Sequence, residues 1–173
     1  MYKIDNYDIE IVNLLMTDGR MSAADIARQL GDISERSVRY RIERMIKEGI
    51  FRVCAIANPK ALGYTVVADV FVEVESGLIM DVARKLSELE CVSYVACSIG
   101  ETDVSVQLVA RSNEEVYSFV TEVIGRIPGV RKTTTSIVPI IVKDVYQWRI
   151  PRSIGETEEK EKAIPRQGIA QSV

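Results

Sequence analysis

The fold is decided by two adjoining stretches, Ser22-Ala-Ala-Asp-Ile-Ala-Arg-Gln-Leu30-Gly31 and Ser34-Glu-Arg-Ser-Val-Arg-Tyr-Arg-Ile-Glu-Arg-Met-Ile-Lys-Glu-Gly49. Each begins with a serine that can cap a helix and ends with a glycine that can terminate one. In the second stretch, Val38, Ile42 and Met45 recur at the spacing of one buried helix face. The pattern predicts two short helices joined by a tight turn, which is the arrangement of a helix-turn-helix.

The second helix carries a concentration of positive charge. Residues 34–52 hold six basic and three acidic side chains, a net charge of +3, whereas the whole chain carries -3. At 100° per residue, Arg36, Tyr40 and Arg44 lie opposite the apolar face, where such a helix would meet DNA. The alternative is a solvated helix face whose arginines pair with glutamates at i,i+4 spacing.

The second helix is therefore the candidate DNA-reading element. Its candidate DNA-binding residues are Ser34, Arg36, Ser37, Arg39, Tyr40, Arg41 and Arg44. We expect Arg36, Ser37 and Tyr40 to reach base edges or the groove, where sequence is read. We expect the other three arginines to contact phosphates, which supply affinity and its salt dependence.

Composition excludes several classes of function. No apolar run reaches the roughly 18 residues of a membrane span, and the N-terminus lacks the apolar region of a secretory signal. The three cysteines have no CxxC spacing, which fits a reducing compartment, so a cytoplasmic location is expected. The chain has no histidine, which removes the commonest catalytic base and metal ligand. We therefore expect no enzyme activity, no metal site and no cofactor.

The chain divides into four parts. Residues 1–50 are expected to form the helix-turn-helix domain, opening with a helix at about 6–17, and residues 51–63 a linker whose alternating pattern at 51–57 predicts a short strand. Residues 64–150 form a second, acidic domain, with 8 basic and 12 acidic side chains. Residues 151–173 read as a C-terminal tail, solvated and mostly without fixed structure.

The second domain has the pattern of a duplicated βαβ. Alternating strands are expected at 65–75, 92–99 and 104–110, helices at 77–89 and from 112 or 113 to 127, and extended chain from 130 to 145. The order βαββαβ implies an antiparallel sheet with two helices on one face, a ferredoxin-like arrangement. The predicted fold class is therefore α+β: an N-terminal winged helix-turn-helix domain followed by a ferredoxin-like domain, whose acidic charge suits a ligand-sensing or assembly role better than DNA binding.

The sheet would keep one face uncovered. Val67, Phe71 and Val109 place apolar side chains on that face, so a second copy of the chain is expected to cover it. In such a homodimer, two helices could read half-sites about one helical turn of DNA apart, ~34 Å.

The chain resembles the Lrp/AsnC family, the feast/famine transcription regulators, from about residue 4 to 143. The segments that carry the resemblance are Ile4-Asp5-x-x-Asp8, Ile11-Val12-x-x-Leu15, Asp18-Gly19-Arg20, Ile26-Ala27, Leu30-Gly31, the stretch from Ser34 to Ile50, the stretch from Val95 through Gly100-Glu-Thr-Asp103, Ile127-Pro128-Gly129-Val130 and Lys143. The resemblance implies double-stranded DNA as a partner and a homodimer that often assembles into tetramers or octamers. It also implies a small amino-acid effector bound between the sensing domains of neighbouring dimers.

By matching position, the resemblance assigns an effector site to two segments. The candidate effector-binding residues are Gly100, Thr102, Asp103, Thr133, Thr134, Thr135 and Ser136. Thr102 stands where the family often has tyrosine. A carboxylate such as Asp103 would suit the ammonium of an amino acid, and backbone amides near Gly100 could take its carboxylate. A plain hairpin turn is the alternative for residues 100–103, because Gly, Thr and Asp are common turn residues.

Two rival functions stay open. The tetrapyrrole (sirohaem) decarboxylases resemble this family in both domains, so fold cannot separate them. Such chemistry is expected to use histidine near the pocket, and this chain has none. The other rival is an amino-acid-binding assembly module that does not bind DNA, against which the basic helix speaks.

Overall fold

The two serine-capped stretches form two of three helices in the computed structural model, which describes residues 2–154. The described chain divides into two compact units. The N-terminal unit comprises residues 2–55 together with 143–154, and the sheet unit comprises Ile56–Val142. Within residues 2–154, no helix combines the length and the apolar character that crossing a bilayer requires.

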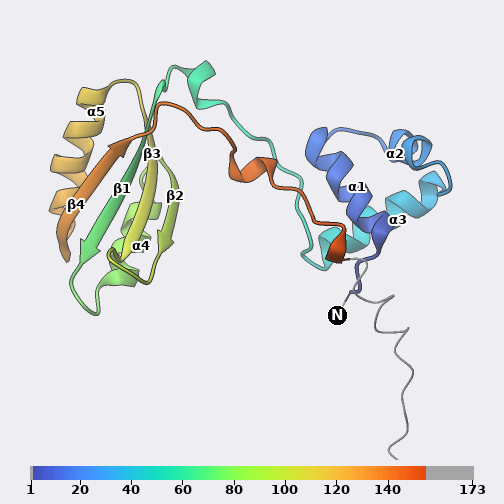
Figure 1. Cartoon of the computed structure of the whole chain (residues 1–173), viewed down its shortest axis with the longest axis horizontal. Helices are drawn as coiled ribbons and strands as arrows, with labels where there is room; N and C mark the ends of the chain where they lie inside the picture. The colour runs from blue at the N-terminus through green and yellow to red at the C-terminus, as the bar shows by residue number, and fades with distance from the viewer. Residues whose placement is uncertain (1, 155–173) are drawn as a thin grey trace, which may run out of the picture. The chain divides into compact units, whose positions relative to one another are not determined.

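The helices of the N-terminal unit are α1 (Asn6–Thr17), α2 (Ala23–Leu30) and α3 (Glu35–Lys47), shown in Figure 1. Ser22 and Ser34 cap α2 and α3 as predicted, each accepting a hydrogen bond from the backbone N–H three residues on. Gly31 ends α2 with a φ of 86°, which a residue with a side chain rarely adopts. The buried hydrophobic core of this unit consists of Ile11, Val12, Ile26, Val38 and Met45.

The short strand predicted at 51–57 of the linker is not formed. Residues 51–58 have no regular secondary structure, and Val53 and Ile56 are more than half exposed. A strand needs a hydrogen-bonded neighbour, and this segment has none within residues 2–154. The short 3₁₀ helix Pro59–Leu62 follows.

The sheet unit contains four antiparallel strands in the order β2-β3-β1-β4. The strands are β1 (Val66–Val74), β2 (Val92–Cys97), β3 (Val104–Ala110) and β4 (Val130–Ile137). The helices are α4 (Ile79–Ser87) and α5 (Asn113–Ser118), and α5 continues through a π turn, Phe119–Val123, and a 3₁₀ turn, Ile124–Arg126. The predicted order βαββαβ is confirmed.

Both helices cover one face of the sheet (Figure 1), and the alternation of β1 shows why. Ala68, Val70 and Val72 are completely buried under Val82, Leu86 and their neighbours. The residues between them point to the other face. There the strand register places Val67 opposite Val109, Asp69 between Gln107 and Ser136, and Phe71 between Ser105 and Thr134.

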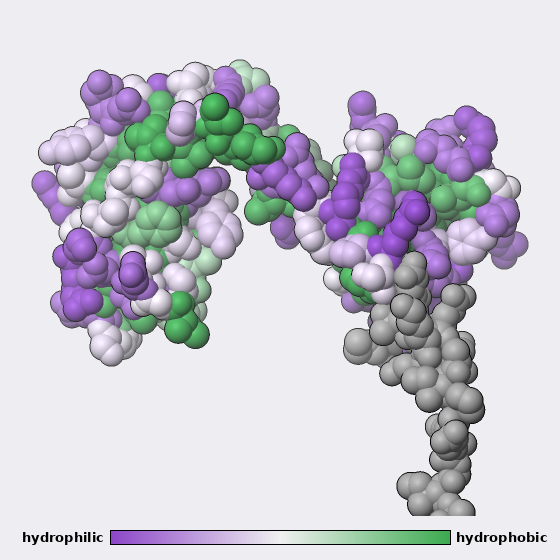
Figure 2. Space-filling view, viewed as in Figure 1, coloured by the Kyte–Doolittle hydropathy of each residue, from purple (hydrophilic) through white to green (hydrophobic). Residues whose placement is uncertain are grey.

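Exposed apolar side chains gather where the chain leaves β4. Ile137, Ile140, Ile141 and Val142 are each between 44% and 92% exposed. Figure 2 shows a hydrophobic stretch along this part of the sheet unit. Such a concentration is typical of a surface that another polypeptide covers.

The C-terminal part of the described chain differs from its expected place. The sequence assigned residues 143–150 to the sensing domain and 151–173 to a tail, whereas residues 143–154 belong to the N-terminal unit and Arg149, Ile150 and Arg152 contact α1. The reason is a set of specific contacts between Asn13 and Ile150 and between Glu10 and Arg152. The prediction for residues 155–173 lies outside the described residues.

Candidate nucleic-acid interface and effector region

The outer face of α3 presents the side chains that the sequence placed there. Arg36, Tyr40 and Arg44 are all exposed, and the Tyr40 side chain is 58% exposed. On the opposite face of α3, Val38 and Met45 pack into the core and have no exposed surface. The helix therefore offers one uninterrupted polar face to solvent.

Arg44 has two aromatic neighbours that define its position. Its guanidinium carbon lies 4.6 Å from the centroid of the Tyr2 ring, a cation–π arrangement. Its Nη1 also donates to the Tyr40 hydroxyl at 3.5 Å, at the long limit of a hydrogen bond. Arg44 is thus exposed and at the same time held over a ring.

Arg41 differs from the other arginines of α3. The sequence grouped it with the phosphate contacts, but its Nη1 donates to Asp5 Oδ2 and Asp8 Oδ1, each at 2.8 Å. Its side chain is only 24% exposed, and Asp8 is 1% exposed. Partial burial lowers the pKa of Arg41, but hydrogen bonds to the two carboxylates outweigh it and raise that pKa overall. Arg41 therefore ties α3 to the start of α1.

Tyr2 and Asp8 complete this internal network. The Tyr2 hydroxyl donates to Asp8 Oδ2 at 2.9 Å, and burial together with that bond raises the pKa of Tyr2 to about 12. Asp8 also closes a capping box with Asp5 at the start of α1. Sequence reasoning identified the Asp5-x-x-Asp8 segment but not its contact with Arg41, because the partners are more than 30 positions apart.

The remaining candidate residues at the start and along the flank of α3 make only short-range contacts or line a hollow. Ser34 Oγ accepts from the Ser37 backbone N–H at 3.2 Å, so Ser34 serves as the helix cap. Arg39 is exposed and pairs with Glu35 one turn earlier, as the alternative of a solvated face proposes for that residue. Ser37 is half-buried beside a hollow of about 280 Å³ that extends along α3 as far as Arg44. The hollow is lined by Tyr2, Lys3, Asp5, Asp8, Ser37, Tyr40, Arg41 and Arg44.

The candidate effector loop is held by its own backbone contacts. Asp103 Oδ2 accepts from the Val74 backbone N–H at 2.8 Å, and the Asp103 N–H donates to the Val72 carbonyl. The Ser98 hydroxyl donates to the Thr102 carbonyl. These bonds are those of an ordered turn, and they occupy one of the two carboxylate oxygens of Asp103.

The facing strand is divided by its pleat. Thr134 pairs with Phe71 and Ser136 with Asp69, so both belong to the open face of the sheet. Thr133 and Thr135 alternate with them and belong to the helix-covered face. Because Thr133 and Val104 both pair with Val72, the loop ending at Asp103 and the first part of β4 flank the same end of β1. Asp103 and Thr133 are thus brought to the same end of β1, whereas Ser136 lies three residues farther along it, opposite Asp69, and the candidates of β4 do not share one face.

Among the residues that the structure describes, no cluster of three or more cysteines, aspartates and glutamates could hold an ion. Cys54, Cys91 and Cys97 are free thiols.

Both parts of the chain match known protein families. Residues 4–46 match the AsnC-type helix-turn-helix domain, and residues 67–147 match the Lrp/AsnC ligand binding domain. An uncharacterised HTH-type transcriptional regulator of Pyrococcus furiosus is 38% identical over 144 residues, covering 83% of this chain and 97% of its own length. The HTH-type transcriptional regulator LrpA of Pyrococcus horikoshii is 35% identical over 136 residues, covering 78% and 96%.

Solved structures agree with the sequence matches. The structure of AsnC from E. coli superposes with a TM-score of 0.76 at 28% identity, covering 84% of this chain and 99% of that one. A transcriptional regulator from Neisseria meningitidis, solved as a complex with L-Met, also gives 0.76, at 21% identity and covering 82% and 93%. The relatives are transcriptional regulators, which favours that function over a decarboxylase. The chain belongs to the Lrp/AsnC family and is a DNA-binding transcriptional regulator with a ligand-binding domain.

Proposed function

We propose that the outer face of α3 enters the major groove of double-stranded DNA. The observation that carries this proposal is the separation of roles on the helix, since Arg36, Tyr40 and Arg44 are exposed together while Arg41 is paired internally. Arg36, Ser37 and Tyr40 reach base edges, and Arg39 and Arg44 contact phosphates. Ser34 fixes the start of the helix, where side chains enter the groove first.

The regulator acts as a homodimer that pairs through the open face of its sheets. Phe71 is 37% exposed on that face, and the apolar residues Val67 and Val109 pair on the same face four residues away along β1. A second copy that covers this face places two α3 helices on one duplex, with half-sites ~34 Å apart. Higher assemblies, tetramers or octamers, extend the same arrangement.

A small amino acid modulates the assembly at the end of β1. Gly100 and Thr102 offer backbone groups, Asp103 has one carboxylate oxygen without a backbone donor, and Thr134 and Ser136 offer hydroxyls on the open face. Thr133 and Thr135 support the strand from the helix-covered side. The L-Met complex of the similar Neisseria meningitidis structure supports this class of ligand.

Binding to DNA is tested first by selection. Fragments retained from a random duplex pool by the full chain give a recognition sequence, and fluorescence anisotropy then measures its dissociation constant from 50 to 300 mM salt. We expect Arg44→Ala to weaken binding to every sequence and to reduce the salt slope by about one.

The matched control is Arg84→Ala. Arg84 is an exposed arginine of α4 whose guanidinium pairs with Asp81, so its removal subtracts the same charge from a different unit. Equal slopes for both variants would contradict the phosphate contact of Arg44. A chain that retains no duplex from the pool would favour an assembly module without DNA binding.

A further inference from the structure

One stripe of α1 is turned away from the other helices. Asn6, Ile9, Glu10 and Asn13 follow each other at i, i+3, i+4 and i+7, which places them on one face. The neighbouring face, with Ile11 and Val12, packs into the helical core. A helix at the edge of a small unit would normally leave such a stripe to solvent, yet Ile9 is 1% exposed.

The stripe is occupied by residues 148–154, which we call the C-terminal strap. Asn13 Oδ1 accepts from the Ile150 backbone N–H at 3.1 Å, and Asn13 Nδ2 donates to the Ile150 carbonyl at 3.4 Å. One side-chain amide thus satisfies both backbone groups of a residue in extended chain, as a neighbouring strand would. Arg149 adds a hydrogen bond to the Asn13 carbonyl.

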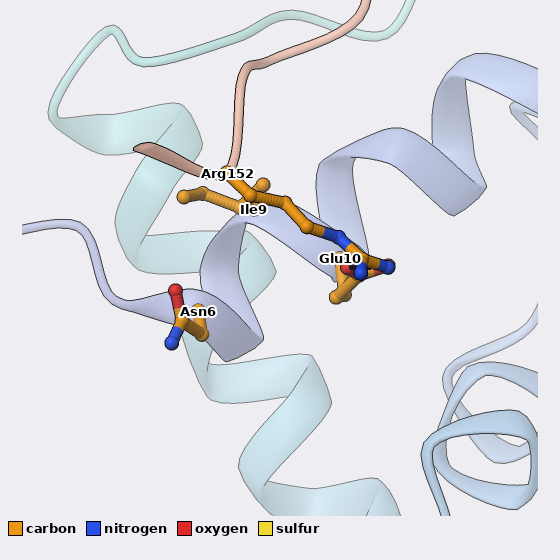
Figure 3. Close-up of a pocket in the computed structure, with 4 residues that line it drawn as sticks. All are labelled: Asn6, Ile9, Glu10 and Arg152. Carbon is orange, nitrogen blue, oxygen red and sulfur yellow. Dashed lines mark ion pairs between the residues drawn. The ribbon is translucent and has the colours of Figure 1, made fainter. Parts of the chain in front are cut away.

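Charge and apolar packing add to this contact. Arg152 Nη2 lies 2.8 Å from Glu10 Oε1, and Figure 3 shows the arginine side chain extended along α1 to reach it. Ile150 packs against the apolar cluster that α1, α2 and α3 share. Between Ile9 and Arg152 a hollow of about 270 Å³ remains, with Asn6 at its other end.

The strap lies beyond both matched family domains, which end at residues 46 and 147. We propose that the Asn6–Ile9–Glu10–Asn13 stripe is a docking surface for the C-terminal strap, and that the docked strap holds α1 against α3 in the position from which α3 reads DNA. Asn13 is accordingly a positioning residue, because it acts through the strap and α1 and does not itself face the duplex. The DNA part of this inference rests on the proposed function, whereas the docking part does not.

Docking is tested by limited trypsin digestion of the full chain. The bond after Arg149 is protected while the strap lies on α1, and cleavage after an exposed residue of the sheet unit, Arg84, serves as the internal clock. Asn13→Ala removes two hydrogen bonds to Ile150, so we expect cleavage after Arg149 to accelerate roughly tenfold relative to the clock. Asn113→Ala is the matched control, because Asn113 is an exposed asparagine at the start of α5 and lies in the sheet unit, away from the strap.

A second variant covers the case in which Asn13→Ala unfolds the unit. Asn13→Asp keeps the acceptor for Ile150 N–H, but it replaces the donor with a carboxylate oxygen that faces the Ile150 carbonyl, so a rate between those of wild type and Asn13→Ala is expected. Circular dichroism confirms that each variant is folded at the digestion temperature. Equal cleavage rates in wild type, Asn13→Ala and Asn13→Asp would overturn the docking surface.

Positioning is tested by DNA affinity with the selected duplex. We expect Asn13→Ala to bind two- to fivefold more weakly, with the salt slope unchanged because no phosphate contact is lost. If Asn13→Ala releases the strap but binds the duplex as tightly as wild type, the positioning role is overturned and the docking surface is not. Wild-type protein that binds no duplex would instead overturn the proposed function, while the digestion result would still decide the docking surface.

Discussion

The guanidinium of Arg44 lies 4.6 Å above the ring of Tyr2, and the hydroxyl of that ring is anchored on buried Asp8. The N-terminal segment thereby supports a side chain of the candidate DNA-reading helix from outside the helix. An arginine held in this way loses less conformational freedom when it meets a phosphate, because part of its ordering has already occurred.

This arrangement predicts coupling between the two residues. Tyr2→Leu removes the ring, and a cation–π contact at an exposed site is worth about 0.5–1 kcal/mol, so DNA binding should weaken about two- to fivefold. In an Arg44→Ala background, Tyr2→Leu should have no further effect. A double-mutant cycle by fluorescence anisotropy measures the coupling, and additive effects of the two substitutions would contradict it.

Arg41 should be needed for stability more than for DNA contact. Arg41→Ala leaves the carboxylate of Asp8 buried without its cation, and we expect a loss of about 1–3 kcal/mol in the free energy of unfolding, less than a fully buried pair because the arginine is partly exposed. Urea unfolding measures the loss. The control is Arg39→Ala, whose exposed pair with Glu35 should contribute less than about 1 kcal/mol. Equal losses for the two variants would refute the assignment.

The raised pKa of Tyr2 predicts a loss of stability in alkali. Below pH 10 the folded and unfolded chains both keep the phenolic proton, so its contribution to stability is complete there. Between pH 10 and about 12 the unfolded chain releases the proton that the folded protein retains, and stability falls as pH rises. Tyr2→Phe should show a shallower fall in melting temperature over this interval. The other tyrosines and lysines titrate in both proteins, so the readout is the difference between the two curves.

Asp103 should have separable structural and sensing roles. Asp103→Ala leaves the Val74 backbone N–H without its acceptor, and we expect a loss of about 1–3 kcal/mol in the free energy of unfolding. Asp103→Asn keeps an acceptor oxygen and should fold normally, but it lacks the charge that binds an ammonium group. Light scattering with a panel of L-amino acids should show a change of assembly for wild type and none for Asp103→Asn. A normal response of that variant would remove Asp103 from the effector site.

The open face of the sheet should control the oligomeric state. Phe71→Asp places a charge on that face and should dissociate the dimer, because an unpaired buried charge is costly. The control is Tyr117→Asp on α5, where the side chain is 71% exposed. Size-exclusion chromatography with multi-angle scattering compares the two masses. A dimer that survives Phe71→Asp would place the interface elsewhere.

The features that could be predicted from the sequence are those whose interacting residues lie close together along the chain. Ser22 and Ser34 cap their helices through residues three positions away, so a local pattern was sufficient to predict them. The pleat of β1 likewise appears in its own sequence, where the buried Val70 and Val72 alternate with Asp69, Phe71 and Glu73. These features gave the fold class and the exposed face of α3.

The pairing of Arg41 and the position of the strap could not be predicted, because they depend on contacts between residues far apart in the sequence. Arg41 looks like its neighbours in the sequence, and only the folded position of Asp8 distinguishes it. The strap has no periodic pattern, and its anchor, Asn13, lies 137 positions before Ile150. The alternation at 51–57 was a false signal because it carries no information on whether a partner strand exists.

The return of the strap to α1 makes the sheet unit an insertion: the chain enters at Ile56 and leaves at Val142, and the DNA-reading unit continues on both sides. Entry and exit are adjacent, since Ala68 at the start of β1 pairs with Ile137 at the end of β4, where Cα atoms of antiparallel partners are about 5 Å apart. This connectivity is that of one domain inserted into the chain of another. Another domain whose two ends lie side by side could be inserted between the same linkers. The DNA-binding unit would then keep its DNA sequence and respond to a different ligand.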